Sequence, residues 1–212
     1  MSSEPARWSV VLIGKWNKAI LSPKGIAKYV FGLPEGTKMQ VQVPVDGVSP
    51  YLVSNPEETL SVHVDDERLQ IDLLKCTYDV LGRAMKSGVD VLETLPITPI
   101  TAVGFKVNFK IPELPDELIR ITECEIDKKV AIAGYEIVNR SIGLSLRWRE
   151  GVVNLSVNRR GEEYQIGCNF HFSATQVAKA QEWLKTPIES IKEQIHNIWT
   201  ILGLEPSGGT DA

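Results

Sequence analysis

The stretch SIGLSLRWREGVVNLSVNRRGEEYQIGCNFHFS, from Ser141 to Ser173, decides the fold class of this chain. Within it, apolar and polar residues alternate, and two short glycine-containing segments interrupt the alternation. A period of two is typical of a half-buried strand, and such short segments join antiparallel neighbours. Together with the run at 130–138, the stretch predicts a meander of strands at 130–138, 142–149, 152–158 and 163–172.

The alternation divides the meander into two faces. One face is predicted to carry the apolar side chains Ile142, Leu144, Leu146, Trp148, Val153, Leu155, Val157, Tyr164, Ile166, Cys168, Phe170 and Phe172. The other is predicted to carry Ser145, Arg147, Arg149, Asn154, Ser156, Asn158, Gln165, Asn169 and His171. A sheet of this kind buries its apolar face under helices and leaves the polar face to solvent or to a partner.

Two helices are predicted to follow the meander. Ser173 and Gln176 have the spacing of a capping box for the first, while Thr186 and Pro187 suit the start of the second, which runs to Gly203. Apolar residues recur along the second helix at steps of three and four and form a seam. The seam either packs on the chain's own sheet or offers a partner surface made of Ile188, Ile191, Ile195, Ile198, Trp199 and Leu202.

The first half of the chain mixes both periodicities. Strands are predicted at 8–13, 38–44, 51–53, 60–64, 68–73 and 100–111, and helices are predicted to begin after Ser22 and Thr77. The predicted fold class is therefore α+β, a largely antiparallel sheet with helices packed on one face and a C-terminal helical pair.

The segment Pro112–Glu117 is the candidate domain boundary, because two prolines interrupt the strand pattern there. It separates an α+β half, 1–112, from the meander and its two helices, 113–212, and one continuous domain is the alternative. Residues 205–212 are expected to be disordered, since they have nothing apolar to bury.

Composition narrows the classes of function. The chain has 23 Lys and Arg against 27 Asp and Glu, a formal net charge of −4, so the surface as a whole is not basic. No apolar run reaches the roughly 18 residues of a membrane span, and no secretory leader is evident. Three cysteines without C-x-x-C spacing indicate reduced thiols. We expect a cytoplasmic protein that does not interact with membranes.

Little in the sequence points to reaction chemistry. His63 adjoins the acidic hairpin tip Asp65-Asp66-Glu67, which is either a solvated turn or a metal site of a hydrolase. No nucleotide-binding glycine-rich loop occurs. The sequence therefore predicts no catalytic, cofactor-binding or metal-ligating residues and no cofactor.

A basic face is the second candidate surface. It consists of Lys106, Lys110, Arg147, Arg149, Arg159 and Arg160. A nucleic-acid platform would also need exposed aromatic residues on which bases stack, and the predicted alternation turns the aromatic residues inward. Solvent or an acidic protein is therefore favoured over nucleic acid as the neighbour of this face.

Two stretches resemble patterns in a family of small uncharacterised bacterial proteins. They are IGKWN at 13–17 with ILSP at 20–23, and LPITPITAVGFKVNF at 95–109. The resemblance covers mainly the first half of the chain. It implies no activity, cofactor or catalytic residue, because none is established for that family.

These observations favour a non-enzymatic cytoplasmic interaction protein, an accessory subunit or adaptor. We expect it to form a homo-oligomer through the helix at 187–203 or through a sheet edge. The alternatives are a nucleic-acid-associated protein that uses the basic face and a metal-dependent hydrolase at the acidic hairpin.

Overall fold

The computed structural model describes residues 3–46, 50–55, 57, 59–112, 114–116, 118–119, 125–160 and 163–204, without the side chain of Arg160. The predicted disordered tail, 205–212, lies outside these residues. The strands are β1 (Glu4–Gly14), β2 (Gln40–Gln42), β3 (Leu52–Asn55), β4 (Leu60–Val64), β5 (Arg68–Leu73), β6 (Ile100–Ile111), β7 (Asn139–Trp148), β8 (Gly151–Arg160) and β9 (Glu163–Ser173). The helices are α1 (Pro23–Tyr29), α2 (Tyr78–Thr94), α4 (Glu125–Ile132), α5 (Val177–Leu184) and α6 (Ile188–Ile201).

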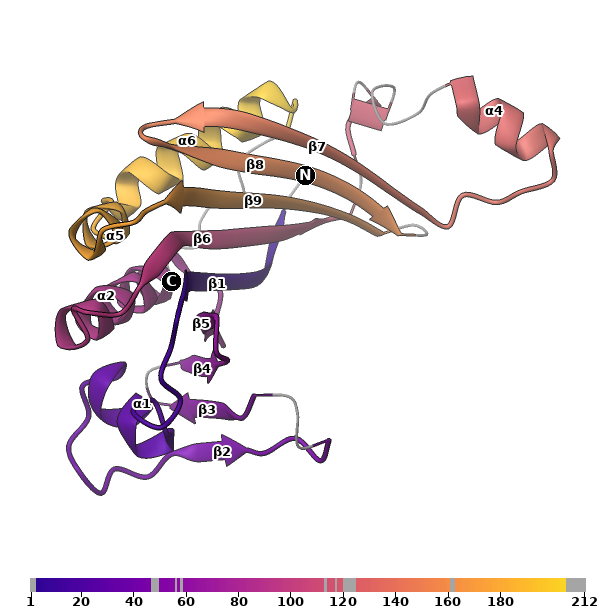
Figure 1. The fold of residues 1–212 in the computed structure, drawn as a ribbon. Helices are drawn as coiled ribbons and strands as arrows, with labels where there is room; N and C mark the ends of the chain where they lie inside the picture. Colours follow the sequence, from indigo (N-terminus) through magenta and orange to yellow (C-terminus); the bar gives the residue numbers. More distant parts are fainter. Residues whose placement is uncertain are drawn as a thin grey trace.

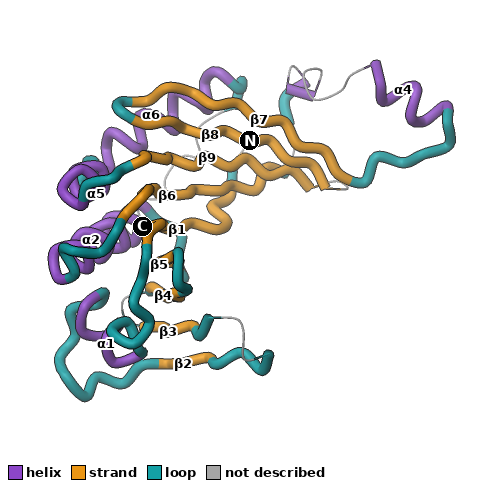
Figure 2. Tube along the Cα trace, viewed as in Figure 1, coloured by secondary structure: helices purple, strands orange, loops and turns teal. Residues whose placement is uncertain are grey.

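All the strands form one nine-stranded sheet in the order β2-β3-β4-β5-β1-β6-β9-β8-β7. Every neighbouring pair in it is antiparallel. Helices α1, α2, α5 and α6 lie on the same side of this curved sheet, as Figures 1 and 2 show. The predicted α+β class, with helices on one face and a C-terminal helical pair, is confirmed.

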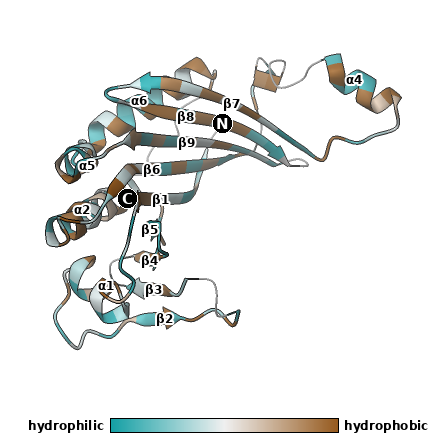
Figure 3. Ribbon diagram, viewed as in Figure 1, coloured by the Kyte–Doolittle hydropathy of each residue, from teal (hydrophilic) through white to brown (hydrophobic). Residues whose placement is uncertain are grey.

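The core lies between the sheet and these helices. One row of apolar side chains crosses the sheet from β3 to β7 and comprises Val53, Val62, Ile71, Val10, Phe105, Phe170, Val153 and Leu146. The rings of Phe105 and Phe170 stack with centroids 4.6 Å apart at the point where β6 meets β9. The alternation of hydrophobic and hydrophilic residues along β7, β8 and β9 is visible in Figure 3.

Side-chain caps mark the starts of α1 and α2. The Ser22 hydroxyl accepts a hydrogen bond from the backbone N–H of Gly25, 3.3 Å away, and Pro23 begins α1. The Thr77 hydroxyl accepts one from the N–H of Val80, 3.4 Å away, and caps α2. Both caps satisfy N–H groups that have no partner within the helix.

The run at 130–138 is not a strand, so the prediction of a first meander strand there is wrong. Residues 125–132 form α4 instead, and β7 is the first strand of a three-stranded meander. Both α5 and α6 also begin without the predicted side-chain caps. Ser173 is still in β9, and the Thr186 hydroxyl donates to the carbonyl oxygen of Trp183 at 2.7 Å.

None of the described helices has both the length and the apolar character needed to cross a membrane.

Candidate functional site

The face of the sheet opposite the helices is the candidate site, and we call it the polar face. Its central row runs through all nine strands and consists of Gln40, Ser54, Ser61, Asp72, Ser9, Lys106, Asn169, Asn154 and Ser145. Every member is polar, whereas the neighbouring row on the helix side, from Val53 to Leu146, is apolar. The short side chains of Ser9, Ser54 and Ser61 are buried between their neighbours. The polar face is therefore a hydrogen-bonding surface with a floor of small residues.

Three of the predicted basic residues lie on the polar face, with Arg147 three strand spacings, about 14 Å, from the strand that carries the other two. Lys106 and Lys110 project from β6 and Arg147 from β7, and all three side chains are exposed. No ion pair engages them within the described part of the chain. On the strands from β6 to β7, Glu163 is the one carboxylate among the described side chains of this face. This half of the polar face therefore has more cations than carboxylates, although Glu4 of the adjacent strand β1 is the register partner of Lys110.

The other predicted members of the basic face lie elsewhere. Arg149 sits in the β7–β8 turn with a φ of 52°, and its Nη1 donates to the Thr186 hydroxyl at 2.9 Å on the helix side. The strand β8 continues through Arg159, which therefore has the orientation of Val157 and lies near the Tyr164 ring, also on the helix side. Arg160 pairs with Asn139 and Glu163 in the register, but its side chain is not described.

The apolar seam of α6 is buried in the chain's own core. Ile191, Ile195, Ile198 and Trp199 are almost fully buried, and Ile188 and Leu202 are partly buried against the same core. The Trp199 ring meets the Phe109 ring edge-on, with centroids 4.8 Å apart. The structure therefore supports the interpretation that the seam packs within the chain. It leaves little of the predicted partner surface accessible.

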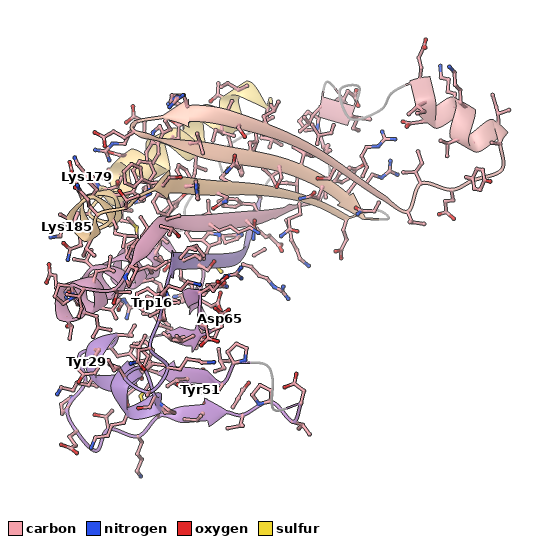
Figure 4. All side chains as sticks on the ribbon, viewed as in Figure 1. Trp16, Tyr29, Tyr51, Asp65, Lys179 and Lys185 are labelled. Carbon is pink, nitrogen blue, oxygen red and sulfur yellow. The ribbon has the colours of Figure 1, made fainter. Side chains whose placement is uncertain are left out.

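The acidic hairpin tip uses its carboxylates for local structure. Asp65 Oδ1 accepts hydrogen bonds from the backbone N–H groups of Glu67 and Arg68, at 2.8 and 2.6 Å. Asp66 pairs with Lys18 at 2.9 Å and Glu67 pairs with Lys15 at 2.6 Å. Figure 4 shows Asp65 among the side chains of this region. Two of the three carboxylates thus have lysine partners, and the third closes the turn.

The histidines do not gather around the acidic hairpin tip. His63 Nδ1 lies 3.4 Å from Asp72 Oδ2 on the polar face, and His171 Nε2 lies 3.4 Å from the Ser173 hydroxyl. Four strand spacings, about 19 Å, separate His63 from His171. Within the described residues, no three His, Cys, Asp or Glu side chains are placed to hold a metal ion.

Burial governs the chemistry of the two described cysteines. It raises the pKa of Cys168 to about 12, so this side chain stays a neutral thiol near pH 7. Burial also raises the pKa of Cys76, whose Sγ lies 2.6 Å from the carbonyl oxygen of Ala6. Both therefore behave as core residues rather than as thiolate nucleophiles.

Part of the polar face escapes sequence reasoning. The serines of β1, β3 and β4 join Lys106 and Asn154 in one row only after nine strands are placed in register. The one local signal was period-two alternation. It predicts that one side of a strand is polar, but it does not predict which strands lie beside it in the sheet.

No protein-family model matches the chain, and no curated protein matches its sequence. Among solved structures, the chain is similar to the TBP of Methanococcus jannaschii at 9% sequence identity and a TM-score of 0.29. That match covers 91% of this chain and 98% of the other. A TM-score this low supports no inference about fold or function.

Proposed function

We propose that the protein is a non-enzymatic interaction protein of the bacterial cytoplasm, an accessory subunit or adaptor. Its working surface is the polar face, and its partner is a protein with an acidic surface. The observation that carries the proposal is the uncovered face itself. Four of the five described helices pack on the other side of the sheet, and the polar face keeps Lys106, Lys110 and Arg147 exposed.

Charge complementarity is the reason for proposing a partner with an acidic surface. Opposed potentials speed encounter and exclude partners of like charge, even when they add little to affinity. The cations lie among amide and hydroxyl side chains, which supply hydrogen bonds to a partner surface. Two of these side chains already bond to each other within the chain, since the Ser145 hydroxyl donates to Asn154 Oδ1 at 2.7 Å.

Affinity purification from the native host tests the proposal. We expect a protein partner to remain bound at low salt after nuclease treatment, and to be lost when Lys106→Glu is combined with Arg147→Glu. The matched control, Lys179→Glu with Lys185→Glu, makes the same change of charge on exposed residues of α5 and its C-cap (Figure 4) and should keep the partner. Equal retention by both double variants, or no retained protein at all, would refute the proposal.

Nucleic acid is the second candidate partner, because the three free cations share one face with few carboxylates. If it binds there, affinity must fall steeply with salt as counterions are released. Replacing Lys106 and Arg147 with alanine should make the plot of log affinity against log salt shallower by about 2. The alanine variant of Lys179 and Lys185 should leave the slope unchanged. Fluorescence anisotropy with a labelled duplex and a labelled single strand measures both slopes.

A further inference from the structure

The outer edge of β7 is the longest unpaired strand edge in the described sheet. The strand lies at one end of the strand order and runs from Asn139 to Trp148, paired on one side with β8. The strand at the opposite end, β2, spans only Gln40–Gln42. Proteins protect sheet edges with short strands, prolines or lysines. The sequence of β7 contains no proline and no lysine, although it includes Arg140 and Arg147, and no described strand pairs with its outer side.

Exposed apolar side chains lie on this edge and immediately before it. Leu144, at the middle of β7 and on the helix side of the sheet, is 56% exposed. Val138 is 68% exposed and Tyr135 is 74% exposed, in the segment that leads into the strand. A row of large apolar residues beside an open edge indicates a contact that is completed by another chain.

Helix α4 extends the same region away from the body of the protein, as Figure 1 shows. None of its residues is buried, and Ile126 and Ile132 are exposed. An ion pair between Asp127 and Arg140 attaches the helix to the start of β7. A cavity of about 980 Å³ between this helix and the sheet is lined by Tyr135 and Ile137 together with charged side chains. Helix α4 is therefore held at the start of the β7 edge.

The sequence of β7 is complementary to itself in an antiparallel register centred on Leu144. In this register each Leu144 faces the partner's Leu144, and Ile142 faces the partner's Leu146. Arg140 then faces the partner's Trp148, and Arg147 faces the partner's Ser141. No like charges meet, and residues that oppose each other have the same parity. Each face of the sheet therefore continues unchanged into the second copy.

We propose that two copies of this chain associate through β7 around a two-fold axis at Leu144 and form one continuous sheet. The axis brings the partner's β7–β8 turn next to Val138 and covers the apolar segment that precedes the strand. The contact is isologous, so it closes after two copies. The proposal deepens the interaction role proposed above by naming a second copy as one partner. Of the three cations of the polar face, Arg147 lies on β7 within this contact, whereas Lys106 and Lys110 lie on β6, away from it.

The oligomeric state measured by light scattering tests this contact. We expect the wild-type chain to be a dimer and Leu144→Lys to be a monomer with an unchanged circular dichroism spectrum, because two lysines would oppose each other on the axis. The control Val41→Lys places the same charge on the other edge strand, at a residue that is 42% exposed, and should remain dimeric. A monomeric wild type, including one that accepts a strand from a different protein, would overturn the proposal.

A disulfide across the axis fixes the register. Leu144→Cys should form a covalent dimer under mild oxidation, since directly opposed residues on antiparallel strands lie within disulfide range. Ser141→Cys, on the same edge but far from its own copy in this register, should not, and neither should the wild type. Dimerisation without the Leu144→Cys link would reject the register. Lys106→Glu combined with Lys110→Glu changes β6 alone and reports separately on the polar face, so the two proposals can fail independently.

Discussion

Ile198→Asp should lower the free energy of unfolding by about 4 kcal/mol, or prevent folding altogether. Ile198 is 1% exposed and lies on α6, next to the Trp199 ring that meets Phe109. Removing an isoleucine of this kind from a core costs about 2–5 kcal/mol, and a buried carboxyl group without a partner adds its own desolvation cost. Urea denaturation followed by circular dichroism measures the loss.

Ile201→Asp is the matched control for this substitution. Ile201 is 78% exposed on the last turn of the same helix, so the change of charge is the same but no core contact is lost. We expect a change of less than about 1 kcal/mol, from the helix dipole alone. If Ile198→Asp folded normally and only weakened an association, the α6 seam would be a partner surface and not part of the core.

The seam shows how far periodicity reaches. Steps of three and four from Ile188 to Leu202 correctly predicted an amphipathic helix with one apolar side. Periodicity does not state what buries that side, because another helix, the chain's own sheet and a second copy all require the same pattern. The partners of α6 become visible only once β6 and the N-terminal residue Ser3 are placed, since Trp199 Nε1 lies 3.4 Å from the Ser3 hydroxyl.

The meander was predictable for a related reason. Hairpins with very short loops keep the parity of one strand locked to the next, so the two faces could be read from residue 142 to residue 172. Alternation did not place Arg149 and Arg159 correctly, because it assigns a face only to residues within a strand of the predicted length. Arg149 left the strand in a turn with positive φ, and β8 carried Arg159 to the helix side by continuing to Arg160.

The prediction of a strand at 130–138 was wrong because the alternation there extends over only a few residues. Val130 and Ile132 alternate with alanines as strand residues do, yet they end a helix that begins at Glu125. Alanine, lysine and glutamate are strong helix formers, and acidic residues in the first turn favour the helix dipole. Composition outweighed a period-two signal of only a few residues.

Gly104→Ala should lower the free energy of unfolding by about 3 kcal/mol. A Cβ at this position would lie 2.2 Å from the carbonyl oxygen of Phe170 on the neighbouring strand. That atom belongs to the backbone of β9, so relief requires moving the strand rather than turning a side chain. Gly143→Ala is the control on the same face, because its Cβ would meet only the Leu155 carbonyl oxygen, at 3.9 Å. We expect it to be neutral or slightly stabilising.

The position of Gly104 makes this substitution a test of domain organisation as well. Within the sheet, β6 and β9 form the one contact between residues 1–112 and 113–212. If the halves fold as a unit, Gly104→Ala must shift one cooperative transition, with the same midpoint for the fluorescence of tryptophans in either half. Native-state hydrogen exchange resolved by peptide separates the two signals and leaves the buried tryptophans in place. Because a strained β6–β9 junction destabilises whatever depends on it, a shift confined to one probe would mean that the halves unfold as separate domains.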